Sequence, residues 1–227
     1  MAFNQYLYSR LPYDPEKDLA PVTQIGSLPL ILIVPASLPV TSVRELIGLA
    51  RSQPGKLSFG SSGVGGATHV TTELFKALAA IDILHVPYKG SGQMMADLLG
   101  GQVSMAFDQI ASSIAHVKSG RLRALAITTA QRSSLLPELT TVAEAGVAGY
   151  EATSWNGIAV PARTPQALID RIRKEIVQVL AIPEIKEKLF VLGIEPIGST
   201  PEQFSAHIKA ERAKWIPLFR KIGVKPQ

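Results

Sequence analysis

Cysteine, charge and long hydrophobic runs are all scarce in this 227-residue sequence. The absence of cysteine excludes a disulfide framework, thiolate metal ligands and a cysteine nucleophile. It does not fix the compartment, because many periplasmic and cytosolic proteins also lack the residue. Charged residues make up 18% of the chain, below the usual ~25%, and hydrophobic residues make up 46%. This composition excludes intrinsic disorder as the main interpretation.

The sequence also lacks a membrane-spanning segment. Its longest apolar run, Leu28–Val34, is interrupted by proline, whereas a spanning helix needs about 20 apolar residues. No charged-then-apolar signal precedes this run, so a mature chain, a fragment and a cytosolic protein all stay open. The net charge of +5 is spread among acidic neighbours, which indicates solvated faces rather than a stripe for nucleic acid. We therefore expect neither membrane insertion nor a nucleic-acid partner.

What the sequence does contain is an alternation of short apolar runs with amphipathic segments. At roughly 150 residues per domain, the length allows one large or two small domains. The expected strands are Leu30–Val34, Leu57–Phe59, Ile83–Tyr88, Val103–Phe107, Leu122–Thr128 and Trp155–Val160. The expected helices before residue 150 are Val43–Ala50, Thr68–Ala80, Ser91–Leu99, Ile110–Val117 and a short one at Thr141–Ala145. This alternation predicts βαβ units and a parallel sheet in one α/β unit from about Val40 to Thr129.

Helices predominate in the part of the sequence after Trp155. Their expected starts all carry proline near the first helical position, at Thr164-Pro165, Pro183 and Thr200-Pro201. The last of these helices contains Pro217, which we expect to kink or end it. The helices need a sheet to pack on, yet only Leu30–Val34 and Trp155–Val160 remain to supply strands.

The most distinctive local feature is the glycine-rich segment Gly60–His69, between an expected strand and an expected helix. It does not match a dinucleotide fingerprint, because the third glycine and the later acidic residue are missing, and it lacks the Gly-Lys-Ser/Thr of a P-loop. One interpretation is a helix N-terminus whose backbone N–H groups bind a carboxylate, helped by the hydroxyls of Ser61, Ser62 and Thr68. The other is a tight turn with capping serines and no ligand.

Further polar residues follow strands at the same expected edge of the sheet, where ligands bind in such folds. Lys89, beside Tyr88 in a second strand-to-helix loop, is either a counter-ion or a solvated lysine. Asp108 is either a helix N-cap or an acceptor for a ligand hydroxyl, amine or water. His69 is the only histidine well placed for a ligand, and Trp155 either lines a cleft or fills a core.

The sequence shows no catalytic or metal-binding motif. It has no G-x-S-x-G elbow, and its four histidines have no metal-ligand spacing and no evident acidic partner. His85, in an expected strand, is interpreted as a packed core histidine. We therefore predict no catalytic residue, metal or cofactor. An α/β enzyme or a protein that binds nucleotide phosphate at the glycine-rich segment remains the alternative to a receptor.

Several segments form a distinctive series from the first residues to the last helix. They are residues 11–22 (LPYDPEKDLAPV), Phe59–His69, His85–Gly92, Asp97–Val103, Phe107-Asp108, Ser119–Ala126, Trp155–Gly157 and Pro161–Pro165. In this order they resemble the extracytoplasmic solute receptors of tripartite tricarboxylate transporters, the TctC or Bug-type family.

The resemblance implies an α/β fold of the periplasmic-binding-protein (Venus flytrap) type, with two α/β domains. It implies a periplasmic receptor that closes on a small mono- or dicarboxylate, delivers it to membrane transporter subunits and catalyses no reaction. Two strand-to-helix loops, one in each domain, would hold the carboxylate through backbone amides and waters. The segment Phe107-Asp108 matches the part of the family that contacts the distal end of the ligand, and Ala2-Phe3-Asn4 matches the end of another pocket loop.

The candidate ligand-binding residues combine these two lines of argument. They are Ser61, Ser62, Gly63, Val64, Gly65, Gly66, Ala67, Thr68, His69, Tyr88, Lys89, Asp108, Trp155 and Asn4. Except for Asn4 and Trp155, they all lie in or beside the expected strand-to-helix connections of the central α/β unit.

The sequence departs from the family pattern at its beginning. The signal peptide, first strand and proline- and glycine-rich loop of the family are missing, and two domains of ~150 residues need roughly 300. We therefore expect residues 40–149 to be a nearly complete second domain, and residues 1–39 with 150–227 to be the remainder of an incomplete first domain. A fragment that binds no ligand, because half of its pocket is missing, is a further alternative.

Overall fold

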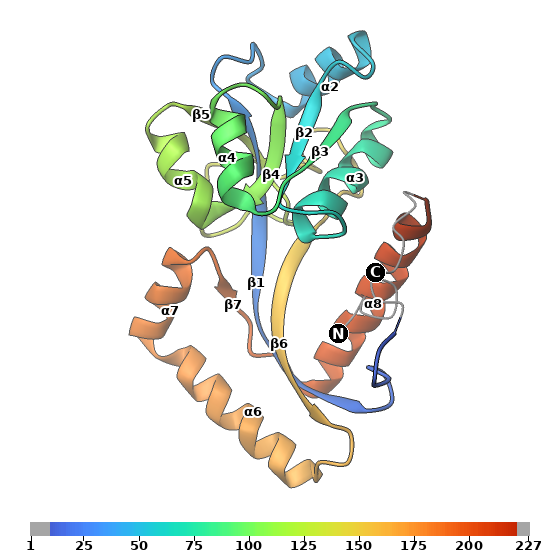
Figure 1. Ribbon diagram of the computed structural model, residues 1–227. Helices are drawn as coiled ribbons and strands as arrows, with labels where there is room; N and C mark the ends of the chain where they lie inside the picture. Colours follow the sequence, from blue (N-terminus) through green and yellow to red (C-terminus); the bar gives the residue numbers. More distant parts are fainter. Residues whose placement is uncertain (1–9, 222–227) are drawn as a thin grey trace. The chain divides into compact units, whose positions relative to one another are not determined.

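The computed structural model describes residues 10–221, which fold as mixed α/β structure (Figure 1). The strands are β1 (Leu19–Pro35), β2 (Ser58–Ser61), β3 (Leu84–Pro87), β4 (Met105–Gln109), β5 (Leu122–Ile127), β6 (Thr153–Pro161) and β7 (Glu195–Pro196). The helices are α2 (Val43–Ser52), α3 (Ala67–Ala79), α4 (Ser91–Leu99), α5 (Ile110–Lys118), α6 (Gln166–Ala181), α7 (Pro183–Val191) and α8 (Pro201–Lys221). All six strands expected from the sequence are present, and β1 is much longer than expected.

The chain divides into two units, which are described separately. Unit 1 comprises Met1–Leu28 and Trp155–Gln227, and unit 2 comprises Pro29–Ser154. The strands β1 and β6 each contribute residues to both units. The assignment of unit 1 as the remainder of a larger domain stays a prediction.

In unit 2 the strands follow the order β3-β2-β4-β1-β5. The strand β2 is parallel to β3 and to β4, as the βαβ pattern predicts. The strands β4 and β5 also run in the same direction, because β1, which lies outside the predicted parallel unit, is inserted antiparallel between them. The apolar pattern of Leu30–Val34 indicates a buried strand but carries no information on its direction, which depends on how the chain enters and leaves the sheet.

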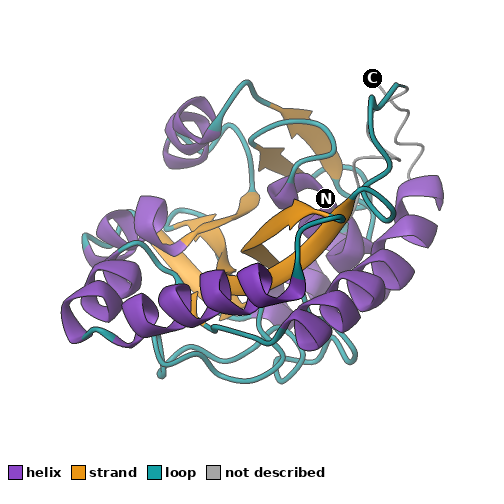
Figure 2. Cartoon of the chain, turned by 90° about the horizontal axis from the view of Figure 1, so that it is seen from below, coloured by secondary structure: helices purple, strands orange, loops and turns teal. Residues whose placement is uncertain are grey.

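Helices cover both faces of the unit 2 sheet (Figure 2). Successive side chains of a strand point to opposite faces, so Ala106 and Phe107 of β4 belong to different layers. Phe107 packs against Phe75 of α3, with ring centroids 5.6 Å apart, and against Tyr150 at 5.8 Å. Ala106 belongs instead to the cluster that includes Met94 of α4 and Ile110 of α5. Side chains therefore pack on both faces of the sheet, and the loops between its strands and helices start and end in packed elements.

In unit 1, β6 and β7 both pair with β1, and α8 packs on β6. A Cβ atom at Gly157 would lie 2.2 Å from the Phe204 ring, so only glycine leaves room for this ring. Trp155 and Trp215 both donate their indole N–H to Oε2 of Glu211, at 3.2 and 3.0 Å. The buried Glu211 carboxylate thus joins β6 to α8.

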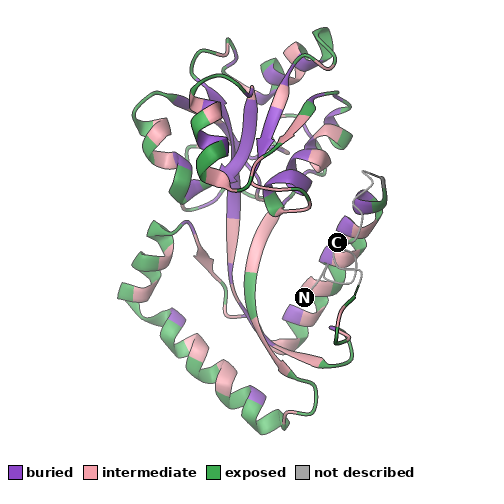
Figure 3. Ribbon diagram, viewed as in Figure 1, coloured by how far each residue is buried: buried purple, intermediate pink, exposed green. Residues whose placement is uncertain are grey.

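Helices α6 and α7 bury little of their apolar surface (Figure 3). In α6 only Ile169 and Leu180 are buried among the described residues, whereas Leu168 and Val179 are 46% and 48% exposed. In α7 the side chain of Val191 is 78% exposed. This exposure agrees with the expectation that few strands remain for these helices to pack on.

One local expectation is wrong, and one of the two effects expected of Pro217, a kink or an end of its helix, is excluded. The expected helix Thr141–Ala145 is a single turn, in which Thr141 and Glu144 exchange side-chain hydrogen bonds and Gly146 has a φ of 113° that ends the helical path. Helix α8 continues through Pro217 to Lys221, so Pro217 does not end it. Within residues 10–221, no helix combines the length and the apolar character needed to cross a bilayer.

Candidate functional site

The glycine-rich loop connects β2 to α3 at one edge of the unit 2 sheet. Its neighbours β3 and β4 also end there and lead into α4 and α5. Because these three strands are parallel, the first turns of α3, α4 and α5 lie at the same edge. In open α/β sheets this edge is where ligands bind.

The N-cap positions and first turns of these three helices lack the side chains that usually neutralise a helix start, although the buried Asp108 carboxylate lies just before α5. Their N-cap residues are Gly66, Gly90 and Gln109, none of which makes a capping side-chain hydrogen bond within the described part of the chain. No first turn of the three contains an acidic residue, whereas α2 is capped by Ser42 and carries Glu45. The first-turn N–H groups and the helix dipoles therefore favour an anion at this edge.

Hydrogen bonds within the loop fix its path. The N–H of Ser62 donates to Oγ1 of Thr68 at 2.9 Å, and the N–H of Gly65 donates to Nδ1 of His69 at 3.0 Å. Gly65 has a φ of 76°, which side-chain-bearing residues rarely adopt. The N–H groups of Ala67 and Thr68 take no part in these bonds and have no acceptor among residues 10–221. The loop thus presents two helix-start amides for an anion.

The other residues of the loop differ in their burial and contacts. Ser61 is fully buried, and its Oγ lies 3.3 Å from the carbonyl oxygen of Gly63. Val64 is 56% exposed and faces solvent, so it contributes no buried contact. The Cβ position of Gly66 lies 3.4 Å from the Gly63 carbonyl oxygen, which leaves little room for a side chain.

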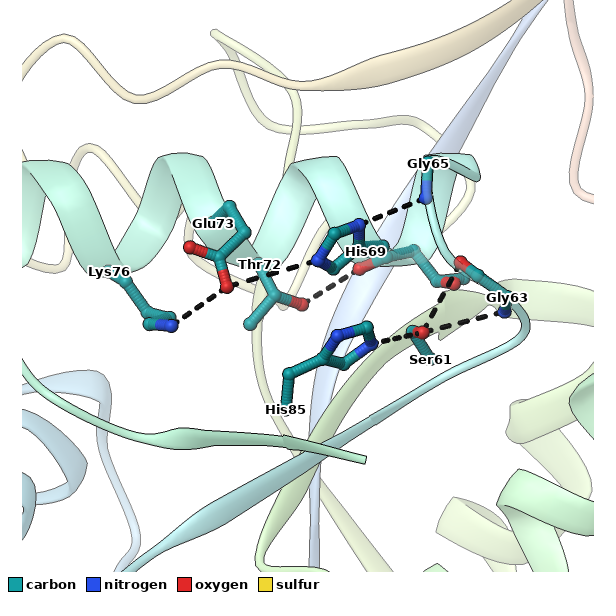
Figure 4. A network of polar contacts seen from close by, with 9 residues as sticks. Ser61, Gly63, Gly65, His69, Thr72, Glu73, Lys76 and His85 are labelled. Carbon is teal, nitrogen blue, oxygen red and sulfur yellow. Dashed lines mark hydrogen bonds and ion pairs between the residues drawn. The ribbon is translucent and has the colours of Figure 1, made fainter. Parts of the chain in front are cut away.

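Two histidines lie directly against the loop (Figure 4). His69 is buried, and its ring stacks on that of His85 with centroids 4.0 Å apart. The Nε2 atom of His85 lies 2.6 Å from Oγ of Ser61. Burial lowers the pKa of His69, and burial with the nearby His69 ring lowers the pKa of His85 to about 4. Both imidazoles are therefore neutral at pH 7.

The residues of the second strand-to-helix loop differ in their surroundings. Tyr88 donates its hydroxyl to Oδ2 of Asp97 at 2.7 Å, and its backbone N–H donates to the carbonyl of Ser61. Burial, together with the Asp97 carboxylate, raises the pKa of Tyr88 to about 12. Lys89 is exposed. Tyr88 thus joins this loop to α4 and to the glycine-rich loop.

Asp108 lies at the end of β4 and is fully buried. Its Oδ2 accepts hydrogen bonds from Ser112 at 2.6 Å and Ser113 at 3.0 Å. Its Oδ1 is buried and has no hydrogen-bond partner among the described residues. Burial raises the pKa of this carboxyl, although the serine hydroxyls oppose the shift. An unpaired buried carboxylate oxygen is costly, which is the usual mark of a site for a water or a ligand group.

The last two candidates, Trp155 and Asn4, are not residues of unit 2. Trp155 belongs to unit 1, where its indole contacts Phe204 and His207 and donates to Glu211. Asn4 lies outside the described residues. Their part in ligand binding stays a prediction.

Sequence reasoning missed the residues that support the site. Ser112 and Ser113 bind the Asp108 carboxylate, and their spacing of four and five residues from it was the available signal. Glu73 and Lys76 of α3 surround the histidine pair, but nothing in the sequence relates them to His85. No group of three or more histidine, aspartate or glutamate residues in the described part of the chain is arranged to hold a metal ion.

Comparisons with known proteins place these features in a family. The family described as the tripartite tricarboxylate transporter family receptor matches residues 1–224. The chain belongs to this family. A protein from the tcbD-tcbE intergenic region of Pseudomonas sp. strain P51 is 37% identical over 96% of this chain and 65% of its own length. Protein BugT of Bordetella pertussis is 32% identical over 99% of this chain and 69% of its own length.

Solved structures of the family show the same fold. The R. palustris protein Rpa4515, solved with adipate, is 39% identical, with a TM-score of 0.84 over 99% of this chain and 75% of that one. The periplasmic binding protein BugD is 30% identical, with a TM-score of 0.81 over all of this chain and 76% of its own. The fold of this family member is therefore of the periplasmic-binding-protein type. The chain spans about two thirds of the length of its first curated relatives.

Proposed function

We propose that this chain acts as an extracytoplasmic receptor that captures a small carboxylate and delivers it to a tripartite-type membrane transporter. The observation that carries the proposal is the uncapped start of α3, where Ala67 and Thr68 present free N–H groups behind a fixed glycine-rich loop. Backbone amides at a helix N-terminus bind anions without any basic side chain. The family to which the chain belongs consists of transporter receptors.

A carboxylate is the anion that the comparisons favour. Rpa4515, at 39% identity, was solved with adipate, a six-carbon dicarboxylate. We assign the segment Ser61–His69 to one carboxylate of such a ligand and the Oδ1 edge of Asp108 to its distal part. Tyr88, Lys89, Trp155 and Asn4 are the further candidates for ligand contact. The capture step is domain closure, the motion by which such receptors enclose their ligand.

Catalysis does not form part of the proposal. The related solved structures are binding proteins. At the loop, His69 and His85 are used in fixed contacts, and Asp108 is bound to two serines. A reaction would need a base or nucleophile beside the bound anion, and the one hydroxyl–imidazole contact at the loop, between Ser61 and His85, involves a fully buried serine that also contacts Gly63.

We further propose that residues 40–149 form a nearly complete ligand-binding domain and that residues 1–39 with 150–227 form part of another. Two observations support this division. The chain covers only about two thirds of its first curated relatives, and the apolar side chains of α6 and α7 stand open to solvent. By analogy with its relatives, the compartment would be the periplasm.

The test is calorimetric titration with a panel of mono- and dicarboxylates, adipate among them. Hexane-1,6-diol has the length of adipate without its charges and serves as the matched control. We expect saturable binding of at least one carboxylate and none of the diol. The proposal is wrong if neither this chain nor the chain extended by its in-frame upstream codons binds any carboxylate.

A further inference from the structure

The rings of His69, His85 and Phe59 form a stack beside the glycine-rich loop. His69 of α3 and His85 of β3 stack with centroids 4.0 Å apart and an angle of 13° between their planes. Phe59 of β2 stacks on His85 at 4.7 Å. Figure 4 shows both imidazoles beside the loop, each directed toward a different part of it.

Each imidazole holds one point of the loop. Nδ1 of His69 accepts the N–H of Gly65 at 3.0 Å, and Nε2 of His85 lies 2.6 Å from the Ser61 hydroxyl. The Ser61 hydroxyl in turn lies within hydrogen-bond distance of both the N–H and the carbonyl of Gly63. The side chain of His69 is only 6% exposed. The two histidines therefore contact the loop between Ser61 and Gly65 through hydrogen bonds. Little of His69 is exposed for any other contact.

We propose that His69 and His85 are positioning residues that, as a neutral pair, hold the loop in its anion-binding conformation, and that protonation of His69 at Nδ1 releases it. This inference rests on the proposed function, because it takes the loop to be the anion site. It assigns the two histidines to the loop and not to direct contact with the ligand.

Protonation is incompatible with the geometry for two reasons. His69 can accept the Gly65 N–H only while Nδ1 carries a lone pair, so a protonated Nδ1 would place two donors 3.0 Å apart. In addition, a charge on one ring would lie 4.0 Å from the other ring in a partly buried stack. The second protonation would then be opposed by repulsion at short range.

Among residues 10–221, the charged side chains that act on the pair are Glu73 and Lys76 of α3. Glu73 Oε1 lies 4.0 Å from Nε2 of His69, and Lys76 donates to the same oxygen at 2.8 Å. The loop and β2 contribute no charged side chain. Burial and then the Lys76 charge lower the pKa of His69, while burial, the His69 ring and Lys76 lower the pKa of His85 to about 4, which Glu73 only partly offsets. The loop is therefore held at neutral pH and released in acid.

Two pairs of variants separate the hydrogen bonds from the packing. His69→Asn keeps an acceptor at the position of Nδ1 and cannot be protonated, whereas His69→Leu removes the acceptor. His85→Gln and His85→Leu make the same comparison at Nε2. With adipate as the probe at pH 7.5, we expect each leucine variant to bind about tenfold more weakly, which is what one ordinary hydrogen bond contributes. The amide variants should stay within about threefold of the wild type.

The pH profile gives a readout that a purely structural role would not change. The affinity for adipate is compared between pH 7.5 and pH 4.5 for the wild type and for the double variant His69→Asn/His85→Gln. Because protonation of adipate affects both proteins equally, it cancels in the ratio. We expect the wild type to lose more affinity than the double variant, by up to about tenfold, because only the wild type can lose the Gly65–His69 hydrogen bond through protonation. His116→Gln changes a partly exposed histidine bound to Arg121; it is the control and should follow the wild type.

A measurement without ligand keeps this inference separate from the proposed function. Amide exchange by NMR should show the Gly65 N–H protected at pH 7, exposed in His69→Leu and protected again in His69→Asn. Acid should expose it in the wild type but not in the double variant. Equal protection in all variants, or identical pH profiles, would overturn the inference even if adipate binds. If adipate fails to bind but the exchange pattern holds, the positioning role stands and the proposed function falls.

Discussion

Gly65 is the residue on which the loop conformation depends most directly. Its φ of 76° is strained for any side-chain-bearing residue, and most of all for a β-branched one. We predict that Gly65→Val costs about 1–2 kcal/mol of stability and abolishes carboxylate binding, because valine cannot hold the φ of 76° and the whole loop must change its path. Titration calorimetry and thermal unfolding measure the two effects.

Gly120 offers a matched control for that change. It has a φ of 72°, follows α5 and has open space around its Cβ position. Gly120→Val should cost a similar amount of stability and leave binding intact. Unchanged affinity in Gly65→Val would remove the glycine-rich loop from the site.

Asp108 makes stability depend on pH in a defined direction. Burial raises its folded-state pKa above the reference value of 3.8, so the folded state binds the proton more tightly than the unfolded state. The free energy of unfolding must then fall as pH rises through the window above about 4. We predict that Asp108→Asn gains stability relative to the wild type between pH 4 and pH 7, measured by urea unfolding. The exposed Asp82→Asn should show no such gain.

Much of the site could be predicted from residues that are close in sequence. The glycine-rich loop, its hydroxyls and the position of Asp108 at a strand end all follow from local patterns. The pairing of His85 with His69 could not be predicted, because it depends on β2 and β3 being neighbours in the sheet. The interpretation of His85 as a packed histidine missed its bond to Ser61 for the same reason.

At the level of elements, the contact between β6 and α8 depends on one glycine. A Cβ atom at Gly157 would meet the Phe204 ring at 2.2 Å. We predict that Gly157→Ala costs about 1–3 kcal/mol, the usual effect of overpacking a tight contact. Adding Phe204→Leu should recover part of this loss, whereas Phe204→Leu alone should destabilise. A double-mutant cycle that compares the free energies of unfolding in urea checks this prediction. Strictly additive losses from the two substitutions would contradict the contact.

The positions of the elements and the parallel direction of β2, β3 and β4 followed from the sequence pattern, but the insertion of β1 did not. Alternating apolar and amphipathic segments located all six expected strands, because burial and pleat impose those patterns. The antiparallel insertion of β1 between β4 and β5 depends on contacts between distant segments. The path of α8 through Pro217 shows that tertiary packing of Trp215 and Phe219 can override a local helix breaker.

For the whole molecule, the two units differ in how well they are packed. The unit 2 sheet is buried on both faces, while α6 and α7 leave several large apolar side chains exposed. Elements with few buried contacts open more readily. We predict that amides of α6 and α7 exchange hydrogen at least about 100-fold faster than those of β4, as measured by mass spectrometry. Equal protection would contradict the view that this part of unit 1 is incomplete.

The central claim is that the start of α3 binds a carboxylate through backbone amides. The most direct test is to follow the backbone amide NMR signals during titration with adipate, with hexane-1,6-diol as the uncharged control. We predict that the signals of Ala67 and Thr68 shift most, in a saturable manner, and that the diol leaves them unchanged. Saturable binding of adipate that moves other amides and leaves those of residues 62–68 in place would contradict the account.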